Sequence, residues 1–473
     1  MSAALVDPAM NVIADRVARR RAQAMIEPSP SARVRRGRLA ALRRLLDEGE
    51  DQLTTAVSAD FGVRSRVETR LTDLFLVRAQ LELAHRKLGR WMRRRRVPTP
   101  MYLWPGRSWV LPQPLGVVGV IGTWNYPIAT VLAPAVCALA AGNRVIAKPS
   151  EQAPRTSEVL AKLIAEYFSP DVFDTVCGGP EVAAEVAAAP FDHLVFTGSA
   201  GVGRKVATAA AQNLTPVTLE LGGKCPAILD PGCDLEAAVA AIAFGKLLNA
   251  GQTCVGVDYV LAPRAMHGAL VEALKRRFSR MFPAWPQGGD YTHIISERHF
   301  GRLQALLEEA VARGAEAVPL STGPGTARAF PPTVVLSPSD DMRLMQEEIF
   351  GPILPIVACE DADQAIAYVN ARDKPLALYW FGRDAATRDR VLDRTFSGGA
   401  TVNGAATHVF QRSLGFGGVG LSGMGEYLGE TGFRRFSKEK SVFVHGPVNP
   451  IALLSPPYGP RTDALLSLLG RLI

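Results

Sequence analysis

The stretch Gly116-Val-Val-Gly-Val-Ile-Gly-Thr-Trp-Asn-Tyr-Pro-Ile128 runs from an uninterrupted apolar segment through a turn into a helical pattern. The apolar segment 116–121 predicts a strand buried on both faces, and 128–141 predicts a helix. A second apolar strand is predicted directly afterwards, at 144–147. Two buried strands joined through a helix indicate a parallel pair, because a parallel connection needs a long crossover. The stretch therefore predicts an α/β fold.

The alternation of strands and helices continues on the C-terminal side. Apolar strands that alternate with helices predict a doubly wound parallel sheet with helices on both faces. A second α/β series begins after Gly223. The predicted strands are 172–177, 193–196 and 215–220, then 259–261 and 377–381, and the predicted helices are 154–168, 181–188 and 202–212, then 235–248, 265–282, 298–313 and 362–371.

The sequence on the N-terminal side of this series has a different character. Residues 9–96 are rich in Arg, Ala and Leu and contain few helix breakers, which predicts helices. Prolines and aromatic residues fill 97–115 and predict an extended segment or a hairpin. Prolines interrupt the chain again after Gly446, and it ends in a short amphipathic stretch, 465–473. We expect this stretch to dock on the protein itself, with a membrane surface as the alternative.

Length and composition bound the class of protein. The chain has 473 residues, enough for two or more domains, and 48% hydrophobic with 21% charged residues is typical of a soluble globular protein. No apolar run is long enough to span a bilayer, and the first ten residues carry no secretory signal. Six cysteines without a paired framework predict reduced thiols and a cytoplasmic location.

The net charge of +8 is concentrated near the N-terminus, in the clusters 33–38 and 86–96. One interpretation is a surface that binds polyanions such as nucleic acid. Leu39, Leu42 and Leu46 recur at helical spacing among the arginines, which favours the solvated faces of amphipathic helices instead. The sequence shows neither zinc-ligand spacing nor an RNA-binding signature. We therefore predict neither a metal site nor a nucleic-acid partner.

A thiol and a carboxylate stand in contexts that fit covalent chemistry. Cys254 ends the turn Asn-Ala-Gly-Gln-Thr-Cys, and Glu220 lies within Thr-Leu-Glu-Leu-Gly-Gly-Lys. A free thiol is mostly protonated near neutrality, and a carboxylate acts as a base only where burial raises its pKa. We predict that the fold brings the two groups together, so that Cys254 attacks a carbonyl carbon and Glu220 later activates water. The alternative is an inert buried thiol and a structural carboxylate at a strand end.

Six short motifs carry a resemblance to a known family. They are Gly-Thr-Trp-Asn-Tyr-Pro (122–127), Lys-Pro-Ser-Glu (148–151), Phe-Thr-Gly-Ser (196–199), Leu-Glu-Leu-Gly-Gly-Lys (219–224), Gly-Gln-Thr-Cys (251–254) and Glu-Glu-Ile-Phe-Gly-Pro (347–352). With these motifs in the family's order, the chain resembles the aldehyde dehydrogenases from about residue 30 to about residue 445. The first motif and the glycine-rich run 416–425 resemble the class 3 branch. The Pro-Pro-Tyr-Gly sequence at 456–459 looks most like the bacterial coniferyl aldehyde dehydrogenases of that branch.

This resemblance implies an aldehyde dehydrogenase-like fold and a division of the chain. A cofactor domain with the doubly wound sheet would bind NAD(P), beside an α/β catalytic domain. A small β bridging element would pair across a homodimer. The implied bounds are 1–96 with 113–220 for the cofactor domain, 221–425 for the catalytic domain, 97–112 with 426–446 for the bridging element, and 447–473 for a C-terminal tail.

The resemblance also implies roles at the reacting centre. Cys254 would be the nucleophile, and its backbone N–H and the side-chain amide of Asn125 would hold the oxyanion that the attack forms. Glu220 would activate the water that hydrolyses the resulting thioester, which implies a free acid as product. Cys225 stands where the family usually has serine. We interpret it as a small tolerated replacement near the site, with oxidative sensitivity as a second possibility.

A nicotinamide cofactor is required because the intermediate must expel hydride and no side chain accepts one. The loop Gly198-Ser-Ala-Gly-Val-Gly203 would hold phosphate at a helix N-terminus, although an ordinary tight turn fits this pattern nearly as well. By resemblance, Lys148 would bond ribose hydroxyls, and Glu151 would bind the adenosine ribose and favour NAD over NADP, which this branch also accepts. Glu348 and Phe350 would hold the nicotinamide ribose and ring. The other implied cofactor-binding residues are Thr123, Trp124, Ser150, Gly198, Ser199 and Val202.

We therefore predict an NAD(P)-dependent aldehyde dehydrogenase that converts an aromatic aldehyde such as coniferaldehyde, or a medium-chain aliphatic aldehyde, to the carboxylic acid. Two other classes stay open. A cofactor-independent thiol hydrolase or acyltransferase would share Cys254, but no histidine base accompanies the motifs. A non-catalytic protein that binds polyanions through its basic N-terminal face would bind in a salt-sensitive way and show no turnover.

Overall fold

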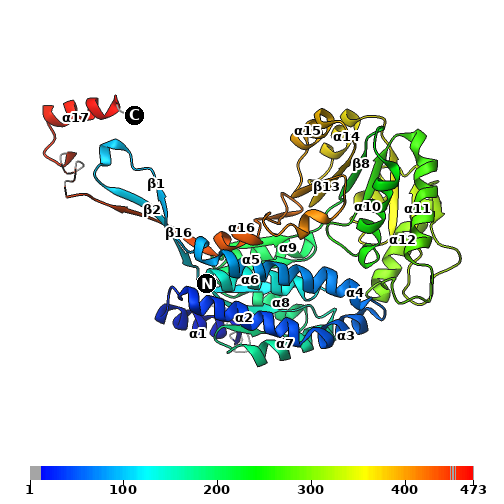
Figure 1. The fold of residues 1–473 in the computed structure, drawn as a ribbon, viewed down its shortest axis with the longest axis horizontal. Helices are drawn as coiled ribbons and strands as arrows, with labels where there is room; N and C mark the ends of the chain where they lie inside the picture. The colour runs from blue at the N-terminus through cyan, green and yellow to red at the C-terminus, as the bar shows by residue number, and fades with distance from the viewer. Residues whose placement is uncertain (1–11, 448, 450–451, 453, 472–473) are drawn as a thin grey trace, which may run out of the picture.

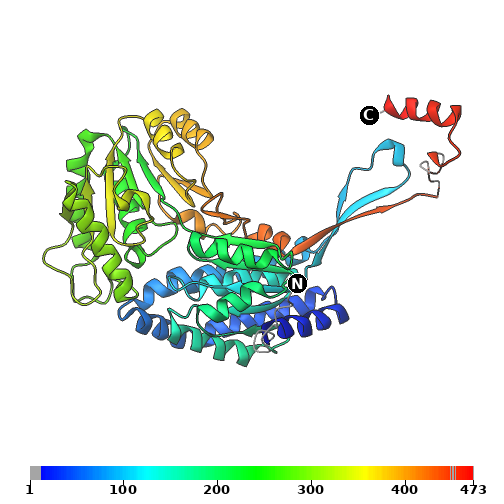
Figure 2. The ribbon, with the colours of Figure 1, turned by 180° about the vertical axis from the view of Figure 1, so that it is seen from behind.

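The computed structural model describes residues 12–447, 449, 452 and 454–471. These residues form two α/β lobes and an arm that projects from the body (Figure 1). The arm is also separate from both lobes in the opposite view (Figure 2). Residues 1–11 of the predicted cofactor domain and residues 472–473 of the predicted amphipathic stretch lie outside the described residues.

A six-stranded sheet forms the centre of the first lobe. In sheet order its strands are β15 (Gly423–Met424), β7 (Val217–Glu220), β6 (His193–Thr197), β3 (Val117–Ile121), β4 (Arg144–Lys148) and β5 (Phe173–Thr175). All neighbouring pairs are parallel except β15 with β7. From β3 the chain adds β4 and β5 on one side and β6 and β7 on the other. The predicted doubly wound sheet is therefore confirmed, and a ligand crevice is expected at the carboxyl ends of β3 and β6, where the order reverses.

Helices cover both faces of this sheet. They are α1 (Val12–Ile26), α2 (Ala32–Glu48), α3 (Glu50–Phe61), α4 (Arg66–Thr69), α5 (Phe75–Trp91), α6 (Ala129–Ala141), α7 (Pro154–Tyr167), α8 (Pro180–Ala188), α9 (Ala200–Ala211) and α16 (Gly429–Arg435), with a π-helical turn at Arg70–Leu74. Helix α6 is buried along almost its whole length and contacts both α2 and α5. Leu39, Leu42 and Leu46 of α2 are buried, as their spacing predicts, whereas most arginines of that helix face solvent.

Arg35 is the exception among these arginines, because it is buried against the C-terminal end of α6. Its guanidinium donates hydrogen bonds to the carbonyl oxygens of Ala140 (3.2 Å) and Ala141 (2.6 Å). The last carbonyls of a helix have no partner within the helix, and the helix dipole favours a cation there. Burial lowers the pKa of Arg35 to about 10. Arg35 therefore stabilises the C-terminal end of α6.

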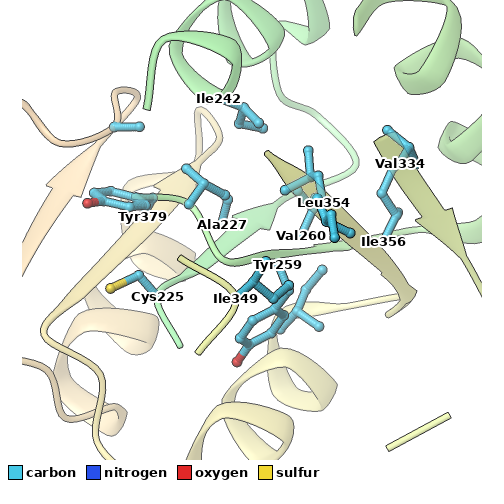
Figure 3. Packing of buried hydrophobic residues seen from close by; sticks show 14 of the residues in the cluster. Cys225, Ala227, Ile242, Tyr259, Val260, Val334, Ile349, Leu354, Ile356 and Tyr379 are labelled. Carbon is cyan, nitrogen blue, oxygen red and sulfur yellow. The ribbon is translucent and has the colours of Figure 1, made fainter. Parts of the chain in front are cut away.

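A seven-stranded sheet forms the centre of the second lobe. In sheet order its strands are β10 (Glu316–Pro319), β11 (Thr333–Leu336), β12 (Ile353–Ala358), β9 (Tyr259–Ala262), β8 (Pro226–Leu229), β13 (Ala377–Phe381) and β14 (Gly399–Val402). Only β10 runs antiparallel to its neighbour in this sheet. Figure 3 shows Ala227, Val260, Ile356 and Val334, from four neighbouring strands, in one apolar core with Ile242.

The helices of the second lobe complete its core. They are α10 (Leu235–Leu247), α11 (His267–Met281), α12 (Glu297–Ala312), α13 (Arg343–Gln346), α14 (Ala362–Asn370) and α15 (Ala385–Arg394). Short 3₁₀ turns lie at Met101–Leu103, Leu248–Gly251, Arg264–Met266 and Thr407–Phe410. The turn that follows α10 is the one that carries the chain to Cys254. Among the described residues, no helix is both long enough and apolar enough to cross a membrane.

The arm is a three-stranded antiparallel sheet of β1 (Arg95–Val97), β2 (Arg107–Pro114) and β16 (Ser437–Val444). The hairpin predicted over 97–115 is thus present. Helix α17 (Pro460–Gly470) lies at the tip of the arm, away from both lobes (Figures 1 and 2). Leu466 and Leu468 of this helix are 52% and 55% exposed. The expected docking of this stretch is therefore wrong for the described chain, because no apolar surface of the lobes reaches the tip of the arm.

The segment before β16 differs from the predicted division of the chain. Residues 426–436 were assigned to the bridging element, but Tyr427, Phe433 and Phe436 belong to the buried core of the first lobe. Helix α16 packs against α6 and α5, and β15 extends the first sheet beside β7. The reason is that the large apolar side chains of this segment would be exposed on a narrow arm, whereas the first lobe buries them. The chain therefore returns to the first lobe before it enters the arm at Ser437.

Candidate active site

Cys254 follows a turn with an unusual backbone. Asn249, Ala250 and Gly251 have φ values of 52°, 50° and 76°. Three successive left-handed residues are costly for L-amino acids, and such strain persists mainly at functional sites. A Cβ atom on Gly251 would lie 2.3 Å from the carbonyl oxygen of Gly351. The turn therefore requires glycine at this position, and it fixes the direction in which the chain presents Cys254.

Replacement of Gly251 with alanine is expected to lower the free energy of unfolding by about 1–3 kcal/mol and to reduce turnover. The added methyl group would clash with backbone, which cannot rotate away. Urea denaturation followed by circular dichroism measures the first effect. Gly268→Ala is the matched control, because a Cβ there meets nothing within 4 Å and the residue lies in helix α11. If both variants are equally stable, the backbone argument is wrong.

An apolar pocket opens onto Cys254. The lining is almost wholly apolar and includes no charged side chain, and its residues with hydroxyl groups are Thr72, Tyr126, Thr130, Thr253 and Tyr427. Such a pocket favours an uncharged apolar molecule that presents one polar group to the thiol. The rest of the lining consists of Leu76, Ala129, Ala133, Leu248, Val255, Ala406, Val409, Phe410, Phe416 and Leu428.

Asn125 lies beside the Cys254 turn, at the carboxyl end of β3. Its side-chain Nδ2 donates to the carbonyl oxygen of Gln252 at 3.1 Å, and the side chain is only 2% exposed. An amide nitrogen carries two hydrogens, so one N–H remains for another acceptor. The next residue, Tyr126, shares a hydrogen bond of 2.5 Å with Thr253. Two neighbouring residues after β3 are thus tied to the two residues before Cys254, as the motif-based prediction requires.

Glu220 ends β7, where it is paired with Gly423 of β15. The side chain is buried, and neither carboxylate oxygen has a hydrogen-bond partner in the described part of the chain. Burial, and to a smaller extent the charge of Glu426, raises the pKa of Glu220 well above its usual range. An unpartnered buried carboxyl group is costly and is more typical of reaction centres than of packing. Burial at this position therefore gives Glu220 the raised pKa that a general base needs.

Cys254 is a neutral group here. Burial raises the pKa of its thiol to about 12, and the charges of Glu348 and Glu220 add to the effect. These two carboxyl groups can act on the sulfur only because the fold brings them close to it. The structure therefore places Cys254, Glu220 and Asn125 at one centre. With a pKa of about 12, the Cys254 thiol is not in its reactive thiolate form near neutral pH.

Cys225 lies directly behind Cys254, as expected from its position after Lys224. Its Sγ donates to the carbonyl oxygen of Cys254 at 3.5 Å and accepts from the N–H of Ala377 at 3.3 Å. The side chain is fully buried at the margin of the second lobe's core, on the same side as Tyr379 (Figure 3). Burial raises the pKa of this thiol well above its usual range. Cys225 is therefore a packing residue of the site with low reactivity toward oxidants.

The opposite side of Cys254 holds the residues expected at the nicotinamide end of a cofactor. The carboxylate of Glu348 accepts a hydrogen bond from the backbone N–H of Gly223, and burial raises its pKa to about 8. A Cβ on Gly222 would lie 1.9 Å from an oxygen of Glu348, so glycine keeps this carboxylate accessible. The rings of Trp124 and Phe350 meet edge-to-face at 5.4 Å. Trp124, the Gly222–Gly223 pair, and Glu348 with Phe350 come from three separate segments of the chain and form one wall of the site.

Two residues at this wall were missed by the motifs. The imidazole of His299 lies 5.0 Å from the ring of Trp124, and burial lowers its pKa to about 4. Arg302, one turn further along α12, donates to the carbonyl oxygens of Glu348 and Ile349. The sequence signal for both was only a helix beginning near residue 298. Nothing in that pattern indicated which face of the helix meets Glu348.

The residues expected at the ribose and phosphate end lie after β4 and β6. Lys148 is buried and forms an ion pair with the exposed Glu151. Ser150 is buried, and its Oγ accepts from the N–H of Gln152 at 3.3 Å. Thr123 lies at the carboxyl end of β3, where its N–H donates to Thr130 at 3.1 Å. These ends share one edge of the sheet, which is the crevice expected for a dinucleotide.

The predicted phosphate loop differs in detail from the structure. Helix α9 begins at Ala200 rather than near Val202, with Ser199 as its N-cap and without a side-chain cap hydrogen bond. Gly198 and Ser199 thus precede free N–H groups, and Val202 is exposed in the first turn. A Cβ on Gly203 would lie 2.7 Å from Leu221, so this glycine serves the packing of the helix on the sheet.

These surroundings fit a nicotinamide dinucleotide. Free helix N–H groups suit a pyrophosphate, and Lys148, Glu151 and Glu348 suit ribose hydroxyls. The hydroxyl of Thr197, the last residue of β6, is buried without a hydrogen-bond partner among the described residues. Among the described residues, we find no group of three or more His, Cys, Asp or Glu side chains arranged to hold a metal ion.

Comparison with known proteins decides the family. Residues 11–442 match the sequence profile of the aldehyde dehydrogenase family. This chain belongs to the aldehyde dehydrogenase family. It is therefore an NAD(P)-dependent enzyme that oxidises aldehydes, and the predicted fold and reaction class are confirmed.

Several relatives of this aldehyde dehydrogenase are similar over nearly their full length. A probable coniferyl aldehyde dehydrogenase of Pseudomonas aeruginosa is 45% identical over 449 residues, which cover 95% of this chain and 94% of the relative. A coniferyl aldehyde dehydrogenase of Pseudomonas sp. is 43% identical, with 94% of each chain covered. A dimeric NADP-preferring aldehyde dehydrogenase of Canis lupus familiaris is 38% identical, with 88% and 90% covered.

Solved structures show the same fold. The substrate-bound state of Staphylococcus aureus AldH superposes with a TM-score of 0.90 and is 34% identical, covering 97% of this aldehyde dehydrogenase and 100% of that chain. The Mycobacterium tuberculosis aldehyde dehydrogenase complexed with NAD+ has a TM-score of 0.81 and 30% identity, with 91% and 89% covered. The arrangement of two lobes and an arm is thus common to the family.

The raised pKa of the Cys254 thiol in this aldehyde dehydrogenase predicts how its alkylation rate depends on pH. With a pKa of about 12, the thiolate fraction of Cys254 should rise about tenfold per pH unit from pH 7 to pH 9, without a plateau. The rate of alkylation by iodoacetamide in the cofactor-free protein should rise in the same way. Mass spectrometry of the peptide that contains Cys254 measures this rate, and a small-molecule thiol of ordinary pKa provides the control. A plateau below pH 8 would contradict the neutral thiol.

Proposed function

We propose that this aldehyde dehydrogenase oxidises an apolar aldehyde to the free carboxylic acid through a thiohemiacetal and then a thioester on Cys254. The observation that carries the proposal is the buried carboxyl group of Glu220, which has no hydrogen-bond partner among the described residues and lies close to the thiol that lines the apolar pocket. An acyl group that is passed to a large thiol acceptor needs no such base. A carboxyl group kept close to the acyl sulfur suits the activation of water.

In the first step, the sulfur of Cys254 loses its proton to water and forms a bond to the aldehyde carbon, while the carbonyl π electrons move to the oxygen. The second N–H of the Asn125 amide and the backbone N–H of Cys254 stabilise the oxyanion, because both donors are held in place before the reaction. Bound NAD(P)+ supplies the acceptor for the hydride of the aldehyde carbon, which leaves a thioester. Glu220 then takes a proton from water, the water oxygen bonds to the acyl carbon, and the carbon–sulfur bond breaks.

For the cofactor, we propose NAD as the preferred form. Glu151 lies beside Lys148 at the position implied for the adenosine ribose. A carboxylate there accepts hydrogen bonds from ribose hydroxyls and repels a 2′-phosphate. Lys148 holds the carboxylate, so its charge is partly balanced and NADP remains a usable second cofactor. The same proposal assigns the holding of this cofactor also to Thr123, Trp124, Ser150, Gly198, Ser199, Val202, Glu348 and Phe350.

For the substrate, we propose an aromatic aldehyde of the coniferaldehyde type, with medium-chain aliphatic aldehydes as further substrates. The pocket offers aromatic side chains from Phe410, Phe416 and Tyr427 and no charge. Two of the relatives carry the name coniferyl aldehyde dehydrogenase.

For the assembly, we propose a homodimer in the cytoplasm, joined through the arm. The arm exposes Trp104, Met101 and Val444, which a second copy would cover. One relative is described as dimeric. Size-exclusion chromatography with light scattering tests this part, and a monomer at micromolar concentration would contradict it.

Reduced-cofactor absorbance is the direct test of the function. Purified protein receives NAD or NADP together with coniferaldehyde, benzaldehyde or hexanal, and the product is identified by chromatography. We expect reduction with each aldehyde, the highest kcat/KM with coniferaldehyde and NAD, and equal amounts of reduced cofactor and carboxylic acid. The absence of reduction in every combination would overturn the proposal. Product that appears only in the presence of coenzyme A would overturn the role of water.

A further inference from the structure

Arg64 is a fully buried cation that the reaction as proposed does not use. It lies between α3 and α4, and its side chain has no exposed surface. It contacts the backbone of Asn125 and does not itself line the pocket, although its neighbours Thr72 and Tyr126 do. Burial of a guanidinium costs desolvation free energy unless hydrogen bonds and opposite charges compensate it. A buried arginine beside a reaction centre therefore calls for an explanation.

The guanidinium contacts several groups at once. Nη1 donates to the backbone carbonyl oxygen of Asn125 at 2.7 Å, and Nη2 donates to the side chains of Thr72 and Asp73, each at 3.0 Å. The ring centroids of Phe61 and Tyr126 lie 4.9 Å and 5.1 Å from the guanidinium carbon. Two rings and three acceptors fix the orientation of this planar cation. A lysine has no planar fork of donors and cannot make the same set of contacts.

The acceptors of Arg64 connect it to the start of helix α6. The second oxygen of Asp73 accepts hydrogen bonds from the N–H groups of Ile128 (3.1 Å) and Ala129 (2.9 Å). These N–H groups open α6, so Asp73 caps the helix that follows the Asn125 motif. Arg64 and Asp73 therefore hold the residues on both sides of Tyr126.

The same cluster reaches the turn before Cys254. The backbone carbonyl oxygen of Asn125 also accepts from the Nδ2 of Asn249 at 3.0 Å, so one oxygen joins Arg64 to the strained turn. The N–H of Asn249 donates to Glu68 at 2.8 Å, and the Nε of Arg64 lies 3.8 Å from the same carboxylate. Two segments, one with Asn125 and one with Cys254, are thus tied to a single cation.

On this geometry, we propose that Arg64 is a positioning residue for the oxyanion site. It fixes the peptide of Asn125 against the Asn249 turn, so that the Asn125 amide and the Cys254 N–H face the same point. The inference rests on the proposed function, because it needs a step in which an oxyanion forms. The competing explanation is that the cluster only stabilises the fold.

Two reactions of the same thiol separate these explanations. Aldehyde oxidation passes through an oxyanion, whereas alkylation of Cys254 by iodoacetamide is a displacement that forms none. Both are measured on full-length Arg64→Met and Arg64→Lys proteins, with thermal unfolding as a check of folding. In Arg64→Met we expect kcat to fall about 100-fold, and alkylation to change less than about threefold. Arg64→Lys should lie between Arg64→Met and the wild type, because it keeps the charge but not the fork of donors.

Arg35→Met is the matched control. Arg35 is as deeply buried as Arg64 and binds carbonyl oxygens at the other end of α6, but it does not contact the site. We expect it to lower stability and to leave oxidation and alkylation in the wild-type ratio. If Arg64→Met does not fold, the ratio in Arg64→Lys decides.

Two results would overturn the positioning role. One is a proportional fall of oxidation and alkylation in the Arg64 variants, and the other is a ratio that matches Arg35→Met. A wild-type protein that reduces no cofactor would instead overturn the proposed function. In that case, the alkylation rates of the variants would still show whether Arg64 affects the geometry of the Cys254 turn.

Discussion

Replacement of Cys254 with alanine is expected to abolish aldehyde oxidation, with a fall in kcat of at least about 10⁴-fold. The reason is that Cys254 is the one cysteine among the described residues that line the pocket, so no other thiol there can attack the aldehyde. Without the thiol there is no covalent intermediate from which hydride can leave. The measurement is steady-state reduction of NAD with coniferaldehyde, together with mass spectrometry for an acyl adduct. The variant should bind cofactor normally and show no adduct.

Cys225→Ser is the matched control for this variant. The two cysteines are neighbours, since the Cys225 sulfur contacts the carbonyl oxygen of Cys254. A serine hydroxyl can make the same contact, so turnover should stay within about threefold of the wild type. Loss of activity in Cys225→Ser together with full activity in Cys254→Ala would reverse the assignment of the nucleophile.

Glu220→Gln is expected to separate the two halves of the reaction. Amide and carboxyl side chains have the same shape, so the thioester should form, but glutamine cannot take a proton from water. Steady-state turnover should fall about 10³-fold, while a single burst of reduced cofactor per active site remains. Stopped-flow absorbance resolves the burst, and mass spectrometry should find acylated Cys254. Rapid turnover without a burst would show that another group activates the water.

The same substitution should make the protein more stable. Because the pKa of Glu220 is raised from an ordinary value of 4.5, its protonated form is the one favoured by folding. Its contribution to stability is fully present below that ordinary value and is lost as the pH rises through the raised pKa. Glutamine carries no charge at any pH. The gain in the free energy of unfolding, of about 0.5–2 kcal/mol, should therefore grow between pH 5 and pH 8.

The fold could be predicted where strands are apolar runs beside clear helices. The segment from β3 to β4 is the best example, because Val117–Ile121 and Val145 are buried on both faces and α6 lies between them. Strand β12 was missed because it contains Pro355, which normally argues against a strand inside a sheet, yet it pairs with β11 and β9 on its two sides. Strand β10 was missed because it is short, half exposed and at an edge.

The residues of the candidate site also fall into two groups, those that sequence motifs predict and those that they do not. Cys254, Glu220 and Asn125 stand in motifs, and the structure places them together. Arg64 and His299 have no motif of their own, and their partners lie 61 residues and 175 residues away in the sequence. In the sequence, Arg64 is one more arginine in a helical region. Only the path of the chain between α3 and α4 turns it toward the site.

The neutral state of the Cys254 thiol affects how long the enzyme remains active. Peroxides and unsaturated aldehydes attack the thiolate form of cysteine. With a pKa of about 12, only about one molecule in 10⁴ carries a thiolate near pH 8. An aldehyde with a conjugated double bond, such as coniferaldehyde, is itself such a poison. The protein without bound cofactor is thus protected from the substrate proposed for it, and covalent damage to Cys254 should accumulate in proportion to the number of turnovers rather than to the age of the molecule.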